Sequence, residues 1–172
     1  MAVHKYTKNL MKIPRPAKKS IVKVAGCWDT WEATEQEYLI HWRFMTKHFG
    51  VDTLYMTPVT GLADKLKNSL DYTESKFVEL PSLEDVIKAN PKLTPVIVDE
   101  NGATELSEFK HPDNALYLFG RVSYSPLESL KGEKLSVRIP SWSKHSNASL
   151  GLLHPHQAAS IVLYDKMTKL WQ

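Results

Sequence analysis

Two apolar runs near the end of the chain each stop at a residue suited to ligand binding. The run from Asn114 to Gly120 reads NALYLFG, and the run that ends at Pro140 reads KLSVRIP. In a parallel sheet, ligands bind in the crevice outside the carboxyl ends of the strands, where glycine lets the backbone approach the ligand closely. This arrangement predicts a ligand pocket at the ends of these two strands.

Three histidines, His145, His154 and His156, follow in the next loop and helix start. Histidine is a common zinc ligand, but no cysteine lies nearby, and only His154 and His156 are close in sequence. Pro155 separates them, and two ligands at i and i+2 at a helix start face a single metal ion poorly. No metal site is therefore predicted, and the histidines are expected to cap the helix or to contact phosphate.

The elements that must position these residues alternate along the chain: apolar runs typical of strands alternate with segments whose apolar residues have helical spacing. The strands are continuous apolar runs, as expected when helices cover both faces of a sheet. The alternation predicts an α/β fold with a mostly parallel sheet flanked by helices. Strands are predicted at 21–25, 51–56, 76–80 and 93–98 and near Leu116 and Val137. A turn is predicted at 99–102. Helices are predicted at 32–49, at 59–68 and at 155–168, and another helix is predicted to begin at the N-cap Ser82.

Composition describes an ordinary globular chain. Its 172 residues are 42% hydrophobic and 24% charged, which suits one folded domain, predicted here at 21–172. No apolar run approaches the roughly 18 residues of a membrane span, and no signal peptide is recognised. The single cysteine, Cys27, fits a reducing compartment. A cytoplasmic protein without a membrane partner is predicted.

Positive charge is concentrated in residues 1–20. This segment contains six lysine or arginine residues and no acidic residue, whereas the whole chain has a net charge of +3. A basic arm on a mildly acidic body suits contact with a polyanion, because each cation near a phosphate releases counterions. A solvated tail is the alternative. The basic residues of the arm are Lys5, Lys8, Lys12, Arg15, Lys18 and Lys19.

The pattern from Leu118 onward resembles the cofactor-binding end of the SPOUT (α/β-knot) RNA methyltransferases. The glycine that ends a strand at 118–120, the isoleucine–proline pair in 138–140 and the serine–leucine pair in 149–151 are similar to that family's motifs. The chain departs from the ribose-methylating branch in two places: no glutamate follows Arg121, and Gly151 stands where an asparagine is common.

Residues 41–52 carry a second likeness, to the first helix of SPOUT ribose methyltransferases. The helix ends in Phe-Gly-Val-Asp and leads straight into an apolar strand, and His41 matches a histidine of the archaeal tRNA-methylating branch. In the broader branch, an arginine six residues before the glycine helps to deprotonate the ribose hydroxyl. Phe44 occupies that position here, and Arg43 is one residue away, so Arg43 is the catalytic candidate.

The resemblance implies an S-adenosylmethionine-dependent RNA methyltransferase with a C-terminal trefoil knot. Transfer RNA is the expected class of RNA substrate. It also implies a homodimer, for which the final helix offers Ile161, Val162 and Tyr164 beside Met167, Leu170 and Trp171. RNA would contact Lys12, Arg15, Lys18 and Lys19. The cofactor-binding residues implied are Val98, Leu118, Phe119, Gly120, Ile139, Pro140, Trp142, Ser149 and Leu150.

Two alternatives remain open at this stage. A catalytically inactive RNA-binding protein on the same fold would explain the missing glutamate and the displaced arginine. An unrelated flavodoxin-like protein should have a Ser/Thr-rich loop after its first strand, and Gly26-Cys27-Trp28-Asp29 is not such a loop. Walker A, GxGxxG and HExxH motifs are absent from the sequence.

Overall fold

The computed structural model describes residues 21–27, 36–57, 75–120, 126–140 and 153–170. Three α-helices are described, α2 (Gln36–Phe49), α4 (Leu83–Lys88) and α5 (Pro155–Leu170), with two short 3₁₀ helices, η1 (Leu106–Glu108) and η2 (Pro126–Ser129). The strands are β1 (Val22–Cys27), β2 (Thr53–Thr57), β3 (Lys76–Glu79), β4 (Thr94–Val98), β5 (Thr104–Glu105), β6 (Ala115–Phe119) and β7 (Leu135–Arg138).

The described strands form one sheet in the order β3-β2-β1-β6-β4-β7-β5, and all neighbouring strands are parallel. The α/β class with a parallel sheet predicted from the sequence is confirmed. The C-terminal trefoil knot stays a prediction, because residues 141–152, which precede α5, lie outside the described residues.

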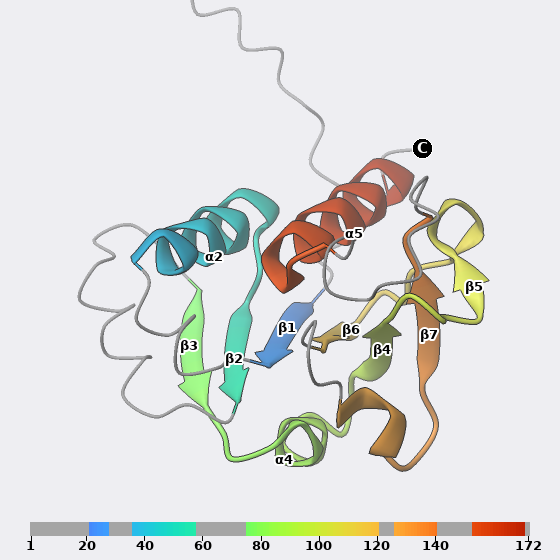
Figure 1. Ribbon diagram of the computed structural model, residues 1–172, viewed down its shortest axis with the longest axis horizontal. Coiled ribbons are helices and arrows are strands. Elements are labelled where there is room, and N and C mark those ends of the chain that lie inside the picture. The colour runs from blue at the N-terminus through green and yellow to red at the C-terminus, as the bar shows by residue number, and fades with distance from the viewer. Residues whose placement is uncertain (1–20, 28–35, 58–74, 121–125, 141–152, 171–172) are drawn as a thin grey trace, which may run out of the picture.

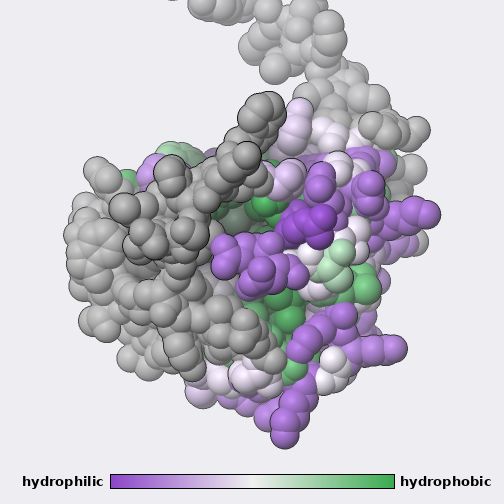
Figure 2. Space-filling model, turned by 45° about the vertical axis from the view of Figure 1, so that its right-hand side comes forward, coloured by the Kyte–Doolittle hydropathy of each residue, from purple (hydrophilic) through white to green (hydrophobic). Residues whose placement is uncertain are grey.

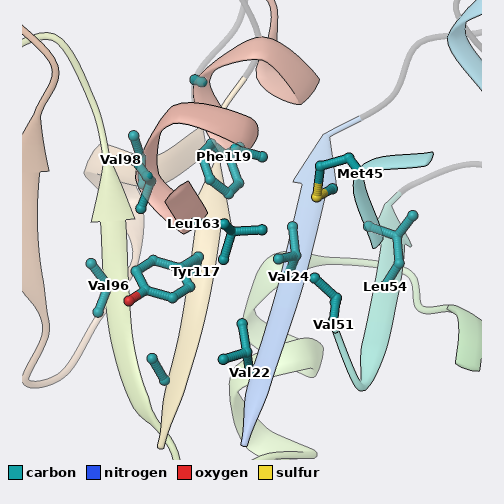
Figure 3. Packing of buried hydrophobic residues seen from close by; sticks show 14 of the residues in the cluster. Val22, Val24, Met45, Val51, Leu54, Val96, Val98, Tyr117, Phe119 and Leu163 are labelled. Atoms are coloured by element: carbon teal, nitrogen blue, oxygen red, sulfur yellow. The ribbon is translucent and has the colours of Figure 1, made fainter. Parts of the chain in front are cut away.

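Helices α2 and α5 lie side by side over one face of the sheet, and α4 lies on the opposite face (Figure 1). On the first face, Leu163 of α5 points between Tyr117 and Phe119 of β6 and Val24 of β1 (Figure 3). On the second face, Leu83 and Val86 of α4 pack with alternate residues of the same strands. Both faces of the central strands are therefore buried, which explains their uninterrupted apolar sequences.

Helix α2 ends where the sequence predicts. Gly50 has a φ of 63°, and the amide of Val51 donates to the carbonyl of Thr46 at 2.9 Å. This is the hydrogen bond of a Schellman motif, which needs a left-handed residue that glycine supplies without strain. Trp42 and Met45 face the core, whereas Phe44 is 60% exposed.

Helix α5 begins at Pro155, as predicted. The carbonyl of His154 accepts from the amides of Gln157 and Ala158, and the Gln157 side chain accepts from the His154 amide at 3.0 Å. The last contact is one half of a capping box. These hydrogen bonds to His154 therefore cap the first turn of α5.

The structure corrects some element boundaries. Strand β1 continues through Gly26 to Cys27 instead of ending at Ala25, because Gly26 pairs with Met56 on one side and Phe119 on the other. The N-cap Ser82 is confirmed, and it accepts from the Asp85 amide at 3.2 Å. The elements β5, η1 and η2 were not predicted, and the helix expected at 59–68 lies outside the described residues.

The sheet ends at β5 in a short and polar edge. Glu105 of β5 lies 3.7 Å from Arg138 of β7 in an ion pair. Figure 2 turns this side of the molecule toward the viewer, and hydrophilic side chains dominate there. A two-residue edge strand with charged neighbours offers little backbone for another strand to pair with.

A buried polar chain fixes the second half of α5. The Nδ1 atom of His111 lies 2.6 Å from the Tyr117 hydroxyl, and its Nε2 atom lies 2.8 Å from Asp165, which also pairs with Lys169 at 2.7 Å. A neutral imidazole satisfies both partners: Nε2–H donates to the carboxylate and Nδ1 accepts from the phenol. Lys169 also donates to the Leu106 carbonyl at 2.6 Å.

Protonation of His111 would break this arrangement, because Nδ1 would become a donor and the buried Tyr117 hydroxyl would lose its acceptor. Burial lowers the pKa of His111 from its usual 6.5, although the Asp165 hydrogen bond acts in the opposite direction. The stability that neutral His111 contributes is therefore complete above about pH 6.5 and is lost as the pH falls, because the unfolded chain then binds the proton more readily.

We therefore expect the free energy of unfolding to fall between pH 7 and pH 5, as measured by urea denaturation. The variant His111→Gln should be less stable at pH 7, by about 1–3 kcal/mol for the disrupted buried hydrogen bonds, and should lose less stability on acidification. The exposed His48→Gln serves as the control and should keep the wild-type pH slope. Equal slopes in wild type and His111→Gln would contradict this account.

Candidate functional site

The carboxyl ends of β6, β4 and β7 lie next to one another at one edge of the sheet. Val98, the last residue of β4, pairs with Phe119 of β6 on one side and with Val137 of β7 on the other. Gly120 directly follows Phe119, and Ile139 follows two residues after Val137. The structure thus brings together the predicted cofactor-binding residues that it describes.

These residues differ in what they can offer a ligand. The side chain of Leu118 is fully buried on the α4 face of the sheet, and that of Phe119 is 1% exposed on the opposite face. Val98 is likewise part of the core. These three can meet a ligand mainly through their backbone, whereas Gly120 and Ile139 are half-buried and Pro140 is exposed.

The turn after β4 is fastened onto β7 beside this edge. A Cβ atom on Gly102 would lie 2.3 Å from the carbonyl carbon of Val137, so only glycine fits this approach. The amide of Asp99 donates to the Val137 carbonyl at 3.0 Å, and Arg138 donates to the Gly102 carbonyl at 3.0 Å. The sequence predicts the turn at 99–102 but not its packing against β7.

Arg43, the catalytic candidate, is half-buried on α2. Its guanidinium carbon lies 5.9 Å from the centre of the Phe44 ring, a distance suited to a cation–π contact. Its catalytic role stays a prediction. The other predicted site residues, Trp142, Ser149 and Leu150 for the cofactor and Lys12, Arg15, Lys18 and Lys19 for RNA, lie outside the described residues.

An open groove of about 1100 Å³ runs between α2 and α5 on the outer side of the molecule. Exposed apolar side chains line it, including Phe44, Leu153 and Ile161. Among its described lining residues, Lys47 is the only lysine or arginine, and no aspartate or glutamate is present. The complete described lining is His41, Phe44, Met45, Lys47, His48, Phe49, Leu153, His156, Gln157, Ser160 and Ile161.

Three histidine rings stack at the wall of this groove, and we call them the histidine column. The ring of His156 lies 5.1 Å from that of His41 with an interplanar angle of 6°, and 5.8 Å from that of His154 with an angle of 14°. The buried Trp42 meets His156 edge-on at 6.3 Å. Burial, followed by the charges of His41 and His154, lowers the pKa of His156 to about 4.

The column was not predicted as such from the sequence. The sequence singles out His154 and His156 with His145, which lies outside the described residues, but it gives no sign that α2 contributes His41. Within the described ranges, no group of three His, Cys, Asp or Glu side chains is arranged to hold a metal ion. None of the described helices has both the length and the apolar character of a membrane-spanning segment.

Solved structures share this architecture. The chain is similar to the SpoU methyltransferase AviRb from Streptomyces viridochromogenes in complex with AdoMet, with 17% identity and a TM-score of 0.63 over 94% of this chain and 61% of that one. An AdoMet-bound rRNA methyltransferase from Sinorhizobium meliloti matches with 14% identity and a TM-score of 0.61, over 91% of this chain and 59% of that one. The chain thus spans about three fifths of the length of these two proteins.

A third structure, described as giving insights into 2-OH methylation of C/U34 on tRNA, matches over 86% of this chain and 95% of its own, with 14% identity and a TM-score of 0.62. No protein-family model and no curated protein sequence matches the chain. The likeness is one of structure at low identity. The chain has the fold of the SpoU/TrmH-type SPOUT RNA methyltransferases.

Proposed function

We propose that this protein is an S-adenosylmethionine-dependent RNA methyltransferase that binds its cofactor at the carboxyl ends of β6, β4 and β7. The observation that carries the proposal is the register of these strands, which places Phe119, Val98 and Val137 side by side. Motifs that are 18 or more residues apart in the sequence thereby meet at one edge of a parallel sheet, where such sheets bind ligands.

The chemistry of this edge fits the proposed cofactor. Adenine needs an apolar surface for its faces and backbone hydrogen-bonding groups for its edges. Half-buried Ile139 and exposed Pro140 supply apolar surface, and Gly120 has no side chain to obstruct its backbone. Trp142, Ser149 and Leu150, in the segment that follows, are the residues we assign to the rest of the pocket.

When bound, S-adenosylmethionine supplies an electrophilic methyl group, which is transferred in line to a hydroxyl oxygen or ring nitrogen of the RNA. This chain contributes positioning of the nucleophile and removal of its proton. Arg43 is our candidate for assisting that proton transfer. Transfer RNA is the substrate class that we favour, with the ribose 2′-oxygen or a base atom as the acceptor.

Cofactor binding tests the pocket directly. We expect Gly120→Val to weaken S-adenosylmethionine binding at least tenfold in calorimetric titration, about 1.4 kcal/mol, because a branched side chain would occupy the ligand's place. Ala103→Val, which places the same branched side chain at an exposed residue just after the neighbouring turn, should bind normally.

An unchanged dissociation constant in folded Gly120→Val would show that the pocket is elsewhere. A wild-type protein that binds RNA but has no affinity for S-adenosylmethionine would instead favour the second candidate, a catalytically inactive RNA-binding protein. The displacement of Arg43 from the family's usual arginine position is the observation that favours this candidate.

We further propose a homodimer that pairs through the groove between α2 and α5. Of the residues expected at the interface, Val162 is fully buried in the core, but Ile161 and Tyr164 are exposed. Phe44 and Ile40 of α2 extend the same apolar face. An RNA would require several fixed cations, whereas Lys47 is the one lysine or arginine among the described groove residues. A second copy therefore fits this surface better.

Light scattering at pH 7.5 and micromolar concentration should give twice the monomer mass of 19.6 kDa. Phe44→Ser and Ile161→Ser should each raise the dimer dissociation constant at least tenfold, since each removes an apolar side chain from the interface. Leu135→Ser is the matched control, because Leu135 is 41% exposed but lies on β7. A monomeric wild type, or loss of RNA binding in Phe44→Ser, would argue against a dimer interface here.

The basic arm should supply electrostatic affinity for RNA. If Lys12, Arg15, Lys18 and Lys19 make about four phosphate contacts, log affinity should fall with log salt with a slope near −3 for a single strand. Replacing all four by glutamine should flatten that slope and leave S-adenosylmethionine binding intact. The control replaces the exposed Lys76, Lys92, Lys110 and Lys131 in the same way. Equal effects of the two quadruple variants would show that the arm has no special role.

A further inference from the structure

The chain crosses over β7 on its way from the end of β4 to the start of β5. In the sheet, β7 lies between these two strands (Figure 1). Val98 of β4 pairs with Val137 of β7 on one side, and Thr104 of β5 pairs with Val137 on the other. The residues between Val98 and Thr104 therefore pass directly over β7. We call residues 99–102, which make most of this passage, the crossing turn.

The crossing contains more chain than the distance requires. Val98 and Thr104 are separated by two strand spacings, about 10 Å, whereas the chain that joins them can extend to about 20 Å. The turn takes up the excess, and within it the Gly102 amide donates to the Asp99 carbonyl at 3.1 Å. A connection with this much slack keeps one position only where contacts offset the entropy of fixing it.

Side chains of β7 supply such contacts on one face of the sheet. Ser136 and Arg138 point to the face opposite the core side chain of Val137, because neighbouring residues of a strand alternate. The Oγ atom of Ser136 accepts from the Ala103 amide at 3.0 Å, and Nη1 of Arg138 donates to the Gly102 carbonyl at 3.0 Å. A Cβ atom on Gly102 would lie 2.5 Å from the Arg138 amide nitrogen, so the turn lies flat on the β7 backbone.

Arg138 makes two contacts with this connection, and they differ in strength. Its Nη2 atom lies 3.7 Å from Glu105, and the two side chains are 41% and 38% exposed, so water screens this ion pair. The hydrogen bond to the Gly102 carbonyl is shorter and has a charged donor, which makes it the stronger contact. The planar guanidinium makes both contacts at once from two nitrogen atoms.

We propose that Arg138 is a positioning residue for cofactor binding: its guanidinium fastens the crossing turn to β7 and thereby holds the carboxyl ends of β4 and β7 at the spacing that the cofactor needs. This inference rests on the proposed function, because it concerns the S-adenosylmethionine pocket at these strand ends. Arg138 acts through the backbone of its neighbours and does not itself contact the cofactor.

The crossing turn is joined to the pocket at both strand ends. It begins directly after Val98, and its first amide, that of Asp99, donates to the Val137 carbonyl at 3.0 Å. Arg138 directly precedes Ile139. Release of the turn would therefore free both ends to move apart. If the released turn were closed in about one tenth of the molecules, the apparent dissociation constant of the cofactor would rise about tenfold.

Calorimetric titration of the full chain with S-adenosylmethionine tests this role, together with hydrogen exchange of residues 99–105. Arg138→Met, which removes the donors but keeps an unbranched side chain, should speed exchange there and weaken cofactor binding about tenfold. Arg138→Lys keeps a charged donor and should recover most of the affinity. Glu105→Gln removes only the screened ion pair, so it should bind the cofactor nearly as the wild type does.

Lys169→Met is the matched control. Lys169 also donates to a backbone carbonyl, that of Leu106, and pairs with an acid, Asp165, but it anchors α5 instead of the crossing turn. Its loss should lower the free energy of unfolding in urea without changing cofactor affinity. Weakening in Lys169→Met as large as that in Arg138→Met would show that lost stability, and not the position of the turn, causes the effect.

The remaining outcomes separate this inference from the proposed function. Wild-type cofactor affinity in folded Arg138→Met, or unchanged exchange at residues 99–105, would overturn the positioning role and leave the pocket standing. Equal weakening in Arg138→Lys and Arg138→Met, or in Glu105→Gln and Arg138→Met, would overturn the hydrogen bond to Gly102 as the fastening contact. A wild type without affinity for S-adenosylmethionine would overturn the proposed function and the role of Arg138 together.

Discussion

The parallel direction of every described strand is the constraint on which the rest of the structure depends. Parallel strands cannot be joined by tight turns, so each connection must cross the sheet, and the crossing helices bury both faces. The same geometry gathers the carboxyl ends of β1, β2, β4, β6 and β7 at one edge. The ends of β6, β4 and β7 become neighbours there, although β7 begins 16 residues after β6 ends.

Much of this fold can be predicted from the sequence because its signals are local. The apolar runs at Thr94–Val98 and Ala115–Phe119 lie in central strands that are covered on both sides, so composition alone marks them. Gly50 and Ser82 mark helix boundaries through their own backbone and side-chain chemistry. Strand β5 has only two residues and exists through its pairing with β7, so no local pattern could reveal it.

The candidate site could be predicted only in part, for the same reason. The strands that lead to Gly120 and Pro140 are visible as motifs, and the sheet places these strands on either side of β4. The histidine column depends on how α2 packs against α5, which brings His41 to within 5.1 Å of His156 across more than 100 residues of sequence. The sequence around a histidine on an amphipathic helix indicates only an ordinary polar residue, because its ring contacts depend on which helix packs against it.

Helix α5 connects the two surfaces that carry the proposals. Its inward side places Leu163 against Tyr117 and Phe119 of β6 (Figure 3), and Phe119 directly precedes Gly120 at the proposed ligand edge. Its outward side carries Ile161 and forms one wall of the groove. The His111–Asp165 contact fixes the distal half of the helix, and Pro155 begins it soon after the predicted cofactor segment. Because a close-packed interior transmits strain, α5 couples the packing at the groove to that of β6 and the proposed ligand edge.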